Sequence, residues 1–251
     1  MSVTGPEDGA PGAGPVRAGV ATCDLQTGLM GGIGMLAALH HRHLTGEGQY
    51  VDLALLDTQI AGLANQGFNH LLTGRVPVRT GSWHPALAPY QPFDTEDDQI
   101  VIAVGNDTQF SDMCRVIGSP EMATDERFST NPMRNKNRAV MEELINKRTR
   151  QKPVAYWVKQ FQKSNVPASP INNIKQAFED PQVKARDMRI DVDHPLAGTM
   201  PGMATPLKYS KTKLEFEKSA PMLGEDTSEV LQRLLGMSQD EVARLKVKGI
   251  V

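Results

Sequence analysis

The sequence predicts an α/β fold, because segments with the apolar spacing of helices alternate with shorter segments typical of strands. Three observations carry this prediction. A segment that is apolar on most sides covers residues 24–43, a strand-turn-helix pattern covers 100–117, and a β-rich segment covers 189–215. With 251 residues the chain is long enough to bury a substantial core, in one large domain or two smaller ones.

Amino-acid composition indicates which kinds of molecule the chain can bind. The 27 basic and 29 acidic side chains give a net charge of -2, which offers no bulk attraction for nucleic acid or an anionic membrane. Two distant cysteines indicate neither a disulfide framework nor a metal cluster, and no apolar stretch is long enough to cross a bilayer. The opening Gly/Pro-rich residues lack the pattern of a signal peptide. We therefore expect a cytoplasmic chain that binds a small molecule or another protein.

The segment 24–43 predicts a helix that is buried, because it is apolar on most sides. Glycines lower helix stability by ~1 kcal/mol each relative to alanine, so we expect them where another backbone packs closely. The helix should end at Gly46, with the preceding Arg and His side chains favourable at the negative end of its dipole. The glycines concerned are Gly28, Gly31, Gly32 and Gly34.

The next elements follow from local signals. Residues 50–53 alternate like a short strand, and a second helix runs from there to about Leu72. A connection with four prolines, over 75–93, is the best candidate for a domain boundary. Residues 100–104 then predict a strand, 105–107 a turn and 108–117 a helix.

The rest of the chain is read in the same way. One or two amphipathic helices fall within 137–165, and a short strand precedes Asn173, which caps a helix stopped by Pro181. Residues 189–215 are β-rich, and two surface helices cover 227–235 and 238–248.

Asp24 is the first candidate for chemistry. At the start of a glycine-rich helix, free N–H groups and the helix dipole would keep a carboxylate ionised. An ionised carboxylate can act as a covalent nucleophile on an activated acyl group. The alternative is a plain structural role, since aspartate at a helix start is commonly an N-cap.

Two loops are further candidates. The stretch "AVGNDTQF" ends a strand and starts a helix, which suits an oxyanion or phosphate but equally suits an ordinary turn. The stretch "TGSWHPALAPY" places His84 and aromatic residues in a proline-stiffened loop, which could line a ligand cleft or simply link domains.

Other polar clusters have plainer interpretations. Three histidines near the helix end, with no acidic residue or cysteine at ligand spacing, favour a dipole role over a metal site. Cys23 lacks a base and is expected to be packed. The run "MRNKNR" is interpreted as a solvated face, although its basic residues could meet a phosphate. The histidines are His40, His41 and His43.

The string "GPVRAGVATCDLQTGLMGGIGMLAALHHRHLTGEGQYVDLALLD" resembles the family III CoA-transferases, also called the CaiB/BaiF family, which includes formyl-CoA and carnitine-CoA transferases. The similarity continues through "HPALAPYQPF", "IVIAVGNDTQF", "VPASPINNI" and the C-terminal "LGEDTSEVLQRLLGMSQDEVARLKVKGIV". The resemblance places Asp24 at the position of the family's nucleophile.

The resemblance implies transfer of coenzyme A from an acyl-CoA to a small carboxylic acid, through an aspartyl anhydride and an aspartyl-CoA thioester. The CoA thioester is a substrate, and no permanently bound cofactor or metal is implied. The family forms interlocked dimers, so a homodimer is expected. Matching positions for substrate or CoA contact are Gly81, His84, Pro85, Ala86, Gly105, Asn106, Asp107 and Thr108.

The resemblance also implies a domain layout, and it implies that a part found in the family has no counterpart in this chain. Residues 1–80 and 189–251 would belong to a large, Rossmann-like CoA-binding domain, and 88–188 to a small α+β domain. The family's N-terminal half has no counterpart here, so we expect a fragment, a split gene whose other half is supplied separately, or an inactive relic. An α-methylacyl-CoA racemase shares the fold, but its usual "D-F-x-G-G" differs from "DLQTG" here, which favours the transferase.

Overall fold

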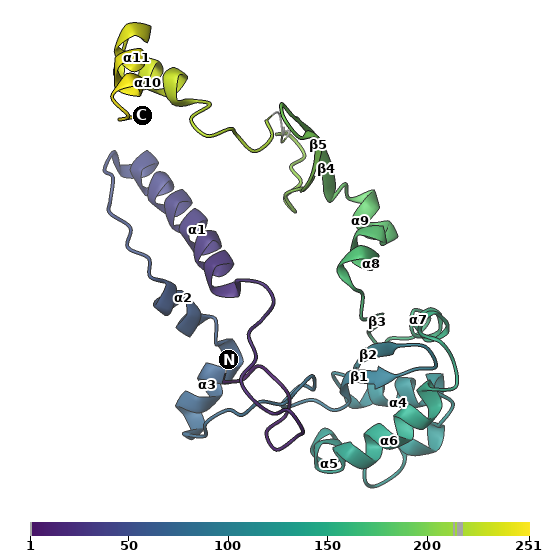
Figure 1. Ribbon diagram of the computed structural model, residues 1–251. Coiled ribbons are helices and arrows are strands. Elements are labelled where there is room, and N and C mark those ends of the chain that lie inside the picture. Colours follow the sequence, from purple (N-terminus) through teal and green to yellow (C-terminus); the bar gives the residue numbers. More distant parts are fainter. Residues whose placement is uncertain (1, 213, 215–217) are drawn as a thin grey trace. The chain divides into compact units, whose positions relative to one another are not determined.

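The computed structural model describes residues 2–212, 214 and 218–251. It contains two compact units, Met1–Ile171 and Asn172–Val251. Both helices and small antiparallel sheets are present (Figure 1), which confirms a mixed helix-and-sheet fold. The predicted domain boundaries at 80, 88 and 188 stay a prediction.

The first unit begins with three helices, α1 (Thr22–Thr45), α2 (Leu55–Ala61) and α3 (Ala64–Thr73). The predicted first helix is confirmed, and Gly46 ends it in the left-handed conformation, with φ of 82°. The predicted second helix is in fact two, because the backbone turns at Ala64, where φ is +47°. Residues 50–53 lie outside any strand, so the alternation there was misleading.

The prediction that the first helix is buried is wrong for the chain as the structure describes it. None of the residues of α1 is buried, and Leu29 and Leu36 are 70% and 69% exposed. The structure shows no other backbone packed against the four glycines: a Cβ would meet only side chains, Leu53 Cδ2 at 3.5 Å from Gly31 and Val51 Cγ1 at 3.3 Å from Gly34. The segment is apolar as predicted, and among the described residues α2, Val51 and Leu53 lie against the helix.

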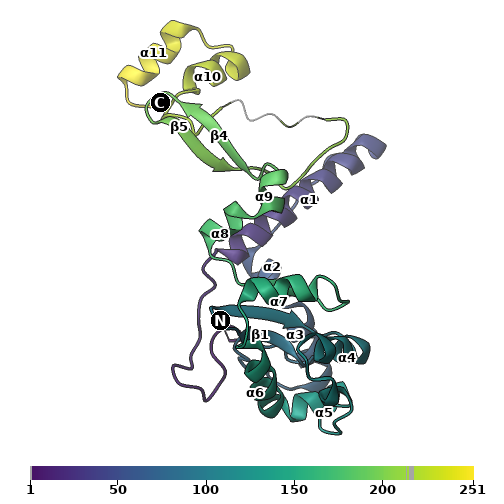
Figure 2. The same ribbon diagram turned by 90° about the vertical axis from the view of Figure 1, so that its right-hand side faces the viewer.

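The first unit also contains a three-stranded antiparallel sheet, with strand order β1 (Tyr90–Asp94), β2 (Gln99–Ala103) and β3 (Ala168–Pro170). Helices α4 (Asp107–Val116), α6 (Arg138–Thr149) and α7 (Val154–Phe161) pack around it (Figure 2). The short helices η1 (Pro120–Ala123) and α5 (Asn131–Lys136) complete the connection between α4 and α6. The strand-turn-helix predicted at 100–117 is thus confirmed.

Strand β1 was missed in the sequence, because it lies inside the proline-rich connection. Pro92 pairs with Val101, and Phe93 with Ile100. A proline has no N–H for a ladder, so it is tolerated here because β1 is an edge strand.

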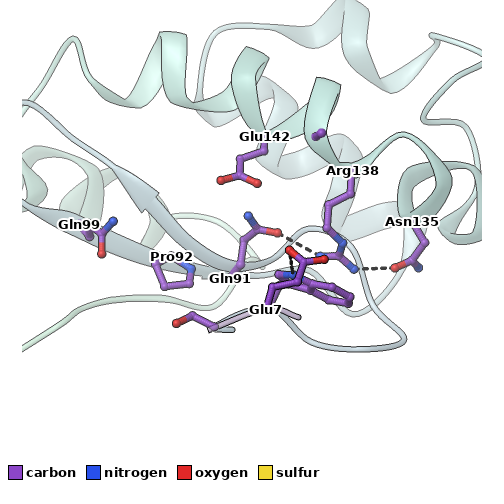
Figure 3. A pocket seen from close by; sticks show the side chains of 10 residues that line it. Glu7, Gln91, Pro92, Gln99, Asn135, Arg138 and Glu142 are labelled. Atoms are coloured by element: carbon purple, nitrogen blue, oxygen red, sulfur yellow. Dashed lines mark hydrogen bonds between the residues drawn. The ribbon is translucent and has the colours of Figure 1, made fainter. Parts of the chain in front are cut away.

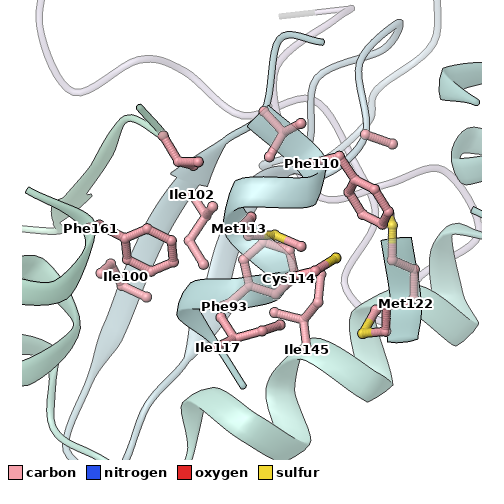
Figure 4. Close-up of a cluster of buried hydrophobic side chains, with 14 of the residues drawn as sticks. Phe93, Ile100, Ile102, Phe110, Met113, Cys114, Ile117, Met122, Ile145 and Phe161 are labelled. Carbon is pink, nitrogen blue, oxygen red and sulfur yellow. The ribbon is translucent and has the colours of Figure 1, made fainter. Parts of the chain in front are cut away.

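One hydrophobic core lies on a single face of this sheet (Figure 4). Alternate residues of β2, namely Ile100 and Ile102, are fully buried and pack with side chains of α4, α6 and α7. The core members from the helices include Phe110, Met113, Cys114, Met141, Ile145, Trp157 and Phe161. This core fixes β2 and the start of α4, which carries part of the candidate site.

The second unit contains α8 (Ile174–Glu179), α9 (Pro181–Ala185), the hairpin β4 (Arg189–His194) and β5 (Gly198–Met203), α10 (Thr227–Leu235) and α11 (Gln239–Val247). Asn173 caps α8 as predicted, and Ser238 caps α11. Pro181 ends α8 and also begins α9. The predicted β-rich segment is confirmed over 189–203, while its residues 213 and 215 lie outside the described residues.

Candidate active site

Asp24 lies in the first turn of α1, three residues after the N-cap Ala21. No side chain caps this helix, so the alternative that Asp24 is the N-cap is wrong. Two of the first four backbone N–H groups of α1 have hydrogen-bond partners. The N–H of Thr22 donates to Val20 O at 2.9 Å, and the N–H of Leu25 donates to Ala21 O at 3.1 Å. Among the described residues, the N–H groups of Cys23 and Asp24 have no hydrogen-bond partner. The exposed carboxylate therefore stands beside two free backbone donors.

The start of α1 is fixed by its contact with α2. The Cys23 thiol donates to Leu55 O at 3.4 Å, and the Thr27 hydroxyl donates to Cys23 O at 2.8 Å. A Cβ at Gly62 would lie 2.7 Å from Gln26 Oε1, so the end of α2 lies close to this turn. Cys23 is half-buried, in line with the expectation that it packs, and its neighbour Asp24 is exposed.

The predicted contact segment 81–86 forms a turn built on His84. Its Nδ1 accepts hydrogen bonds from the N–H groups of Ala86 at 3.1 Å and Leu87 at 3.0 Å, and its ring stacks on Tyr90 with centroids 5.3 Å apart. Since Nδ1 is an acceptor, the neutral ring carries its proton on Nε2 and can donate it outward. His194, in a second His-Pro sequence, makes the same pair of bonds, so this turn is a local motif.

The predicted segment 105–108 is the N-terminus of α4. Asn106 is its N-cap and accepts from the N–H of Gln109 at 2.9 Å. The Gln109 side chain accepts from Gly105 N–H at 2.7 Å and donates to Asn165 O at 2.9 Å. Within the described residues, the N–H groups of Asp107 and Thr108 are unpaired, and these two donors are what the turn offers a ligand.

Four polar side chains of α5 and α6 hold the segment 84–91 in place. We call them the polar stripe, because their spacing of i, i+3, i+4 and i+7 puts them on one face. Their amide and guanidinium groups donate to the carbonyls of Ala86, Ala88, His84 and Leu87, with distances of 2.7–3.1 Å. The stripe consists of Asn131, Arg134, Asn135 and Arg138.

Interpretation of "MRNKNR" as a solvated face is therefore wrong. Arg134 is only 1% exposed, and it pairs with Asp107 at 2.7 Å. The spacing of these polar residues is visible in the sequence. Most of the groups to which they donate are backbone carbonyls, which every residue has and which a sequence therefore cannot identify.

A pocket of about 560 Å³ lies beside the stripe (Figure 3). Arg138 points into it, donates to Gln91 Oε1 at 3.0 Å and stacks over the Trp83 ring at 4.4 Å. Burial lowers the pKa of Arg138, although Glu142 and Glu7, which line the same pocket, oppose that shift. The pocket is polar, and the guanidinium of Arg138 already makes hydrogen bonds to protein groups.

The structure joins two of the three predicted parts of the site. Arg134 links the segment at Ala88 to Asp107 at the start of α4. Among the described residues, no hydrogen bond or ion pair joins Asp24 to either segment.

The described residues contain no group of three or more His, Cys, Asp or Glu side chains placed to hold a metal ion. None of their helices combines the length and apolarity needed to cross a membrane.

The family model described as CoA-transferase family III matches residues 1–227. The chain belongs to this family. Among curated relatives, a succinate–glutarate CoA-transferase of Agrobacterium fabrum is 41% identical over 93% of the chain and 58% of its own length. A succinyl-CoA:glutarate CoA-transferase of Homo sapiens is 34% identical over 100% of the chain and 56% of its own length.

A solved structure supports the same assignment. The crystal structure of a CaiB/BaiF family protein from Brucella suis matches with a TM-score of 0.77 and 39% identity, covering 93% of this chain and 60% of that one. The chain thus spans a little over half the length of the relatives that it matches.

Proposed function

We propose that the chain carries the nucleophile-bearing part of an enzyme that transfers coenzyme A from an acyl-CoA to a small carboxylic acid. Membership of CoA-transferase family III supports the reaction class, and the curated relatives named above suggest succinyl-CoA and glutarate as substrates to test. The observation that carries the proposal is the placement of Asp24, whose carboxylate lies in the first turn of α1 beside two free N–H groups.

The proposed reaction has four steps. The Asp24 carboxylate attacks the donor thioester, the C–S bond breaks, and a mixed anhydride and CoA thiolate result. The thiolate attacks the aspartyl carbonyl, the anhydride C–O bond breaks, and the donor leaves as a free carboxylate. The acceptor carboxylate then attacks the aspartyl-CoA thioester and releases thiolate again. Attack of that thiolate on the acceptor acyl group forms the new acyl-CoA and restores Asp24, with no net proton change.

Each addition places negative charge on an oxygen close to Asp24. Backbone N–H groups that are already oriented stabilise such an oxyanion without reorganisation. The free donors of Cys23 and Asp24 are suited to this, and the helix dipole favours the ionised nucleophile.

The loop segments are proposed to contact acyl-CoA. His84 offers its Nε2–H, and Asp107 and Thr108 offer free N–H groups at a helix start. The remaining residues proposed for contact surround these donors in the two turns: Gly81, Pro85, Ala86, Gly105 and Asn106.

We further propose a homodimer, with additional protein beyond this chain completing the site. The exposed apolar side chains of α1 support this, because a face of that size is normally covered. Leu25, Leu29, Ile33, Leu36 and Leu39 are each between 49% and 70% exposed.

The test is formation of glutaryl-CoA from succinyl-CoA and glutarate, followed by mass spectrometry. It is run on the chain alone and on the chain mixed with the part of the Agrobacterium fabrum relative that it does not match. We expect product that disappears in Asp24→Asn and persists in Asp57→Asn, the matched carboxylate in the first turn of α2. Absence of product in both mixtures, or product from Asp24→Asn, would contradict the proposal.

A further inference from the structure

Arg134 has an unusual environment for a charged side chain. It is the largest of the fully buried side chains, at 1% exposure. Its guanidinium lies 4.6 Å from the centroid of the Phe110 ring. Burial of an arginine is tolerated only when its donors are satisfied, and here all three nitrogens have partners.

The three partners belong to three different parts of the chain. Nε donates to Ala88 O at 2.7 Å, Nη1 to Phe128 O at 3.0 Å, and Nη2 to Asp107 Oδ1 at 2.7 Å. Ala88 ends the His84 turn, and Asp107 begins α4. One planar group thus spans the two segments that the proposed function assigns to acyl-CoA contact.

The chemistry of the group makes this link rigid. A guanidinium holds its donors in a fixed plane, whereas a lysine ammonium is a point charge on a flexible stem. The Ala88 peptide is fully buried and also donates its N–H to Asn131 Oδ1 at 3.1 Å, so it has little freedom to move away. A movement of either segment therefore has to be matched by the other, or it breaks the buried bond to Ala88 O or the part-buried bond to Asp107.

We infer that Arg134 is a positioning residue that fixes the His84 turn relative to the start of α4, so that acyl-CoA meets both segments in one geometry. This inference rests on the proposed function. It assigns Arg134 no contact with the reacting atoms. Its loss should weaken binding of the CoA substrate and leave the acylation of Asp24 at saturation nearly unchanged.

Two variants test the link from its two ends. Arg134→Lys keeps the charge and removes the planar fork. Asp107→Ala keeps the backbone N–H of residue 107 and removes only the carboxylate partner of Arg134 Nη2. Because the Asp107 side chain is 67% exposed, water can replace that partner and the variant should fold. The matched control is Arg115→Ala, which removes a 65% exposed arginine that pairs with Asp112 on the same helix.

The kinetic readout is acylation of Asp24 by succinyl-CoA at varied concentration. We expect both variants to raise the half-saturating concentration by about fivefold or more, the usual lower range for energetic coupling, with the saturating rate within about twofold of wild type. The control should match wild type in both quantities. A fall in the saturating rate with unchanged half-saturation would overturn the inference.

Hydrogen–deuterium exchange gives a readout that does not need catalysis. In Arg134→Lys, amides of residues 84–89 and 105–110 should exchange faster together, and in Arg115→Ala neither should. Faster exchange in one segment alone, or unchanged exchange in both, would overturn the inference. Wild-type chain that is never acylated would contradict the proposed function, while the exchange result still decides whether Arg134 couples the two segments.

Discussion

Replacement of Asn106 by alanine tests the structural role of one predicted contact residue. Asn106 stands at the N-cap of α4 with extended backbone, and its Oδ1 accepts the N–H of Gln109 at 2.9 Å. Alanine removes this acceptor, whereas Asn106→Asp keeps an oxygen in the same place and adds a charge that a helix N-terminus favours.

The expected magnitude follows from exposure and bond length. The cap is exposed, so water can replace the lost acceptor, and the cost should be about 1 kcal/mol in the free energy of unfolding rather than that of a buried unpaired group. Asn106→Asp should stay within about 0.5 kcal/mol of wild type. Thr130→Ala at the start of α5 is the control, because its cap bond is 3.4 Å long and should contribute less.

Urea unfolding followed by tryptophan fluorescence measures the effect, since Trp83 and Trp157 both belong to the first unit. With a denaturant slope of about 1–3 kcal/mol per M, the Asn106→Ala midpoint should fall by roughly 0.3–1 M. An unchanged midpoint, or an aspartate variant as unstable as the alanine variant, would refute the assignment of Asn106 as a cap.

Three further predictions concern the core and its edge. Thr149→Val should lower the free energy of unfolding by about 1–3 kcal/mol, because the fully buried hydroxyl donates to Asp94 O at 2.5 Å, and calorimetry should show the loss. Burial raises the pKa of Cys114 to about 12, so at pH 8 an alkylating reagent should label Cys23 and spare Cys114, whereas equal labelling of the two peptides would be inconsistent with the fold. Hydrogen bonds from Gln99 and then Arg150 lower the pKa of Asp94 below 3.8, so its stabilisation is complete above that value and is lost as pH falls through the folded pKa; urea midpoints of Asp94→Asn measured from neutral to acid pH should therefore fall less steeply than those of wild type.

Local sequence signals were sufficient to predict the helices whose ends carry capping residues. The helix at 227–235 and the capped helix after Ser238 follow from apolar spacing and cap residues. Strand β1 was missed because its pairing with β2 is not local, and because Pro92 argues against a strand unless the strand is known to be at an edge.

Burial and polar contacts were the harder part of the prediction. The pattern of α1 correctly indicates apolar side chains, but no local pattern states which part of a chain, or which other protein, covers them. Arg134 was interpreted as solvated because charged residues usually are, and its partners at Ala88 and Phe128 are carbonyl oxygens that any residue supplies. The proposed role of Asp24 rests on its place at a helix start and on the family resemblance, and the structure adds the free N–H groups beside it.

The most direct test of the nucleophile is to locate the carboxylate that becomes activated as an anhydride or thioester. The chain, with and without the unmatched part of its relative, is incubated with succinyl-CoA, treated with hydroxylamine, digested and sequenced by tandem mass spectrometry. We predict a hydroxamate on Asp24 and on no other carboxylate, including Asp57 at the start of α2. Hydroxamate on a different residue, spread over many exposed carboxylates, or absent from Asp24 while CoA transfer proceeds, would contradict it.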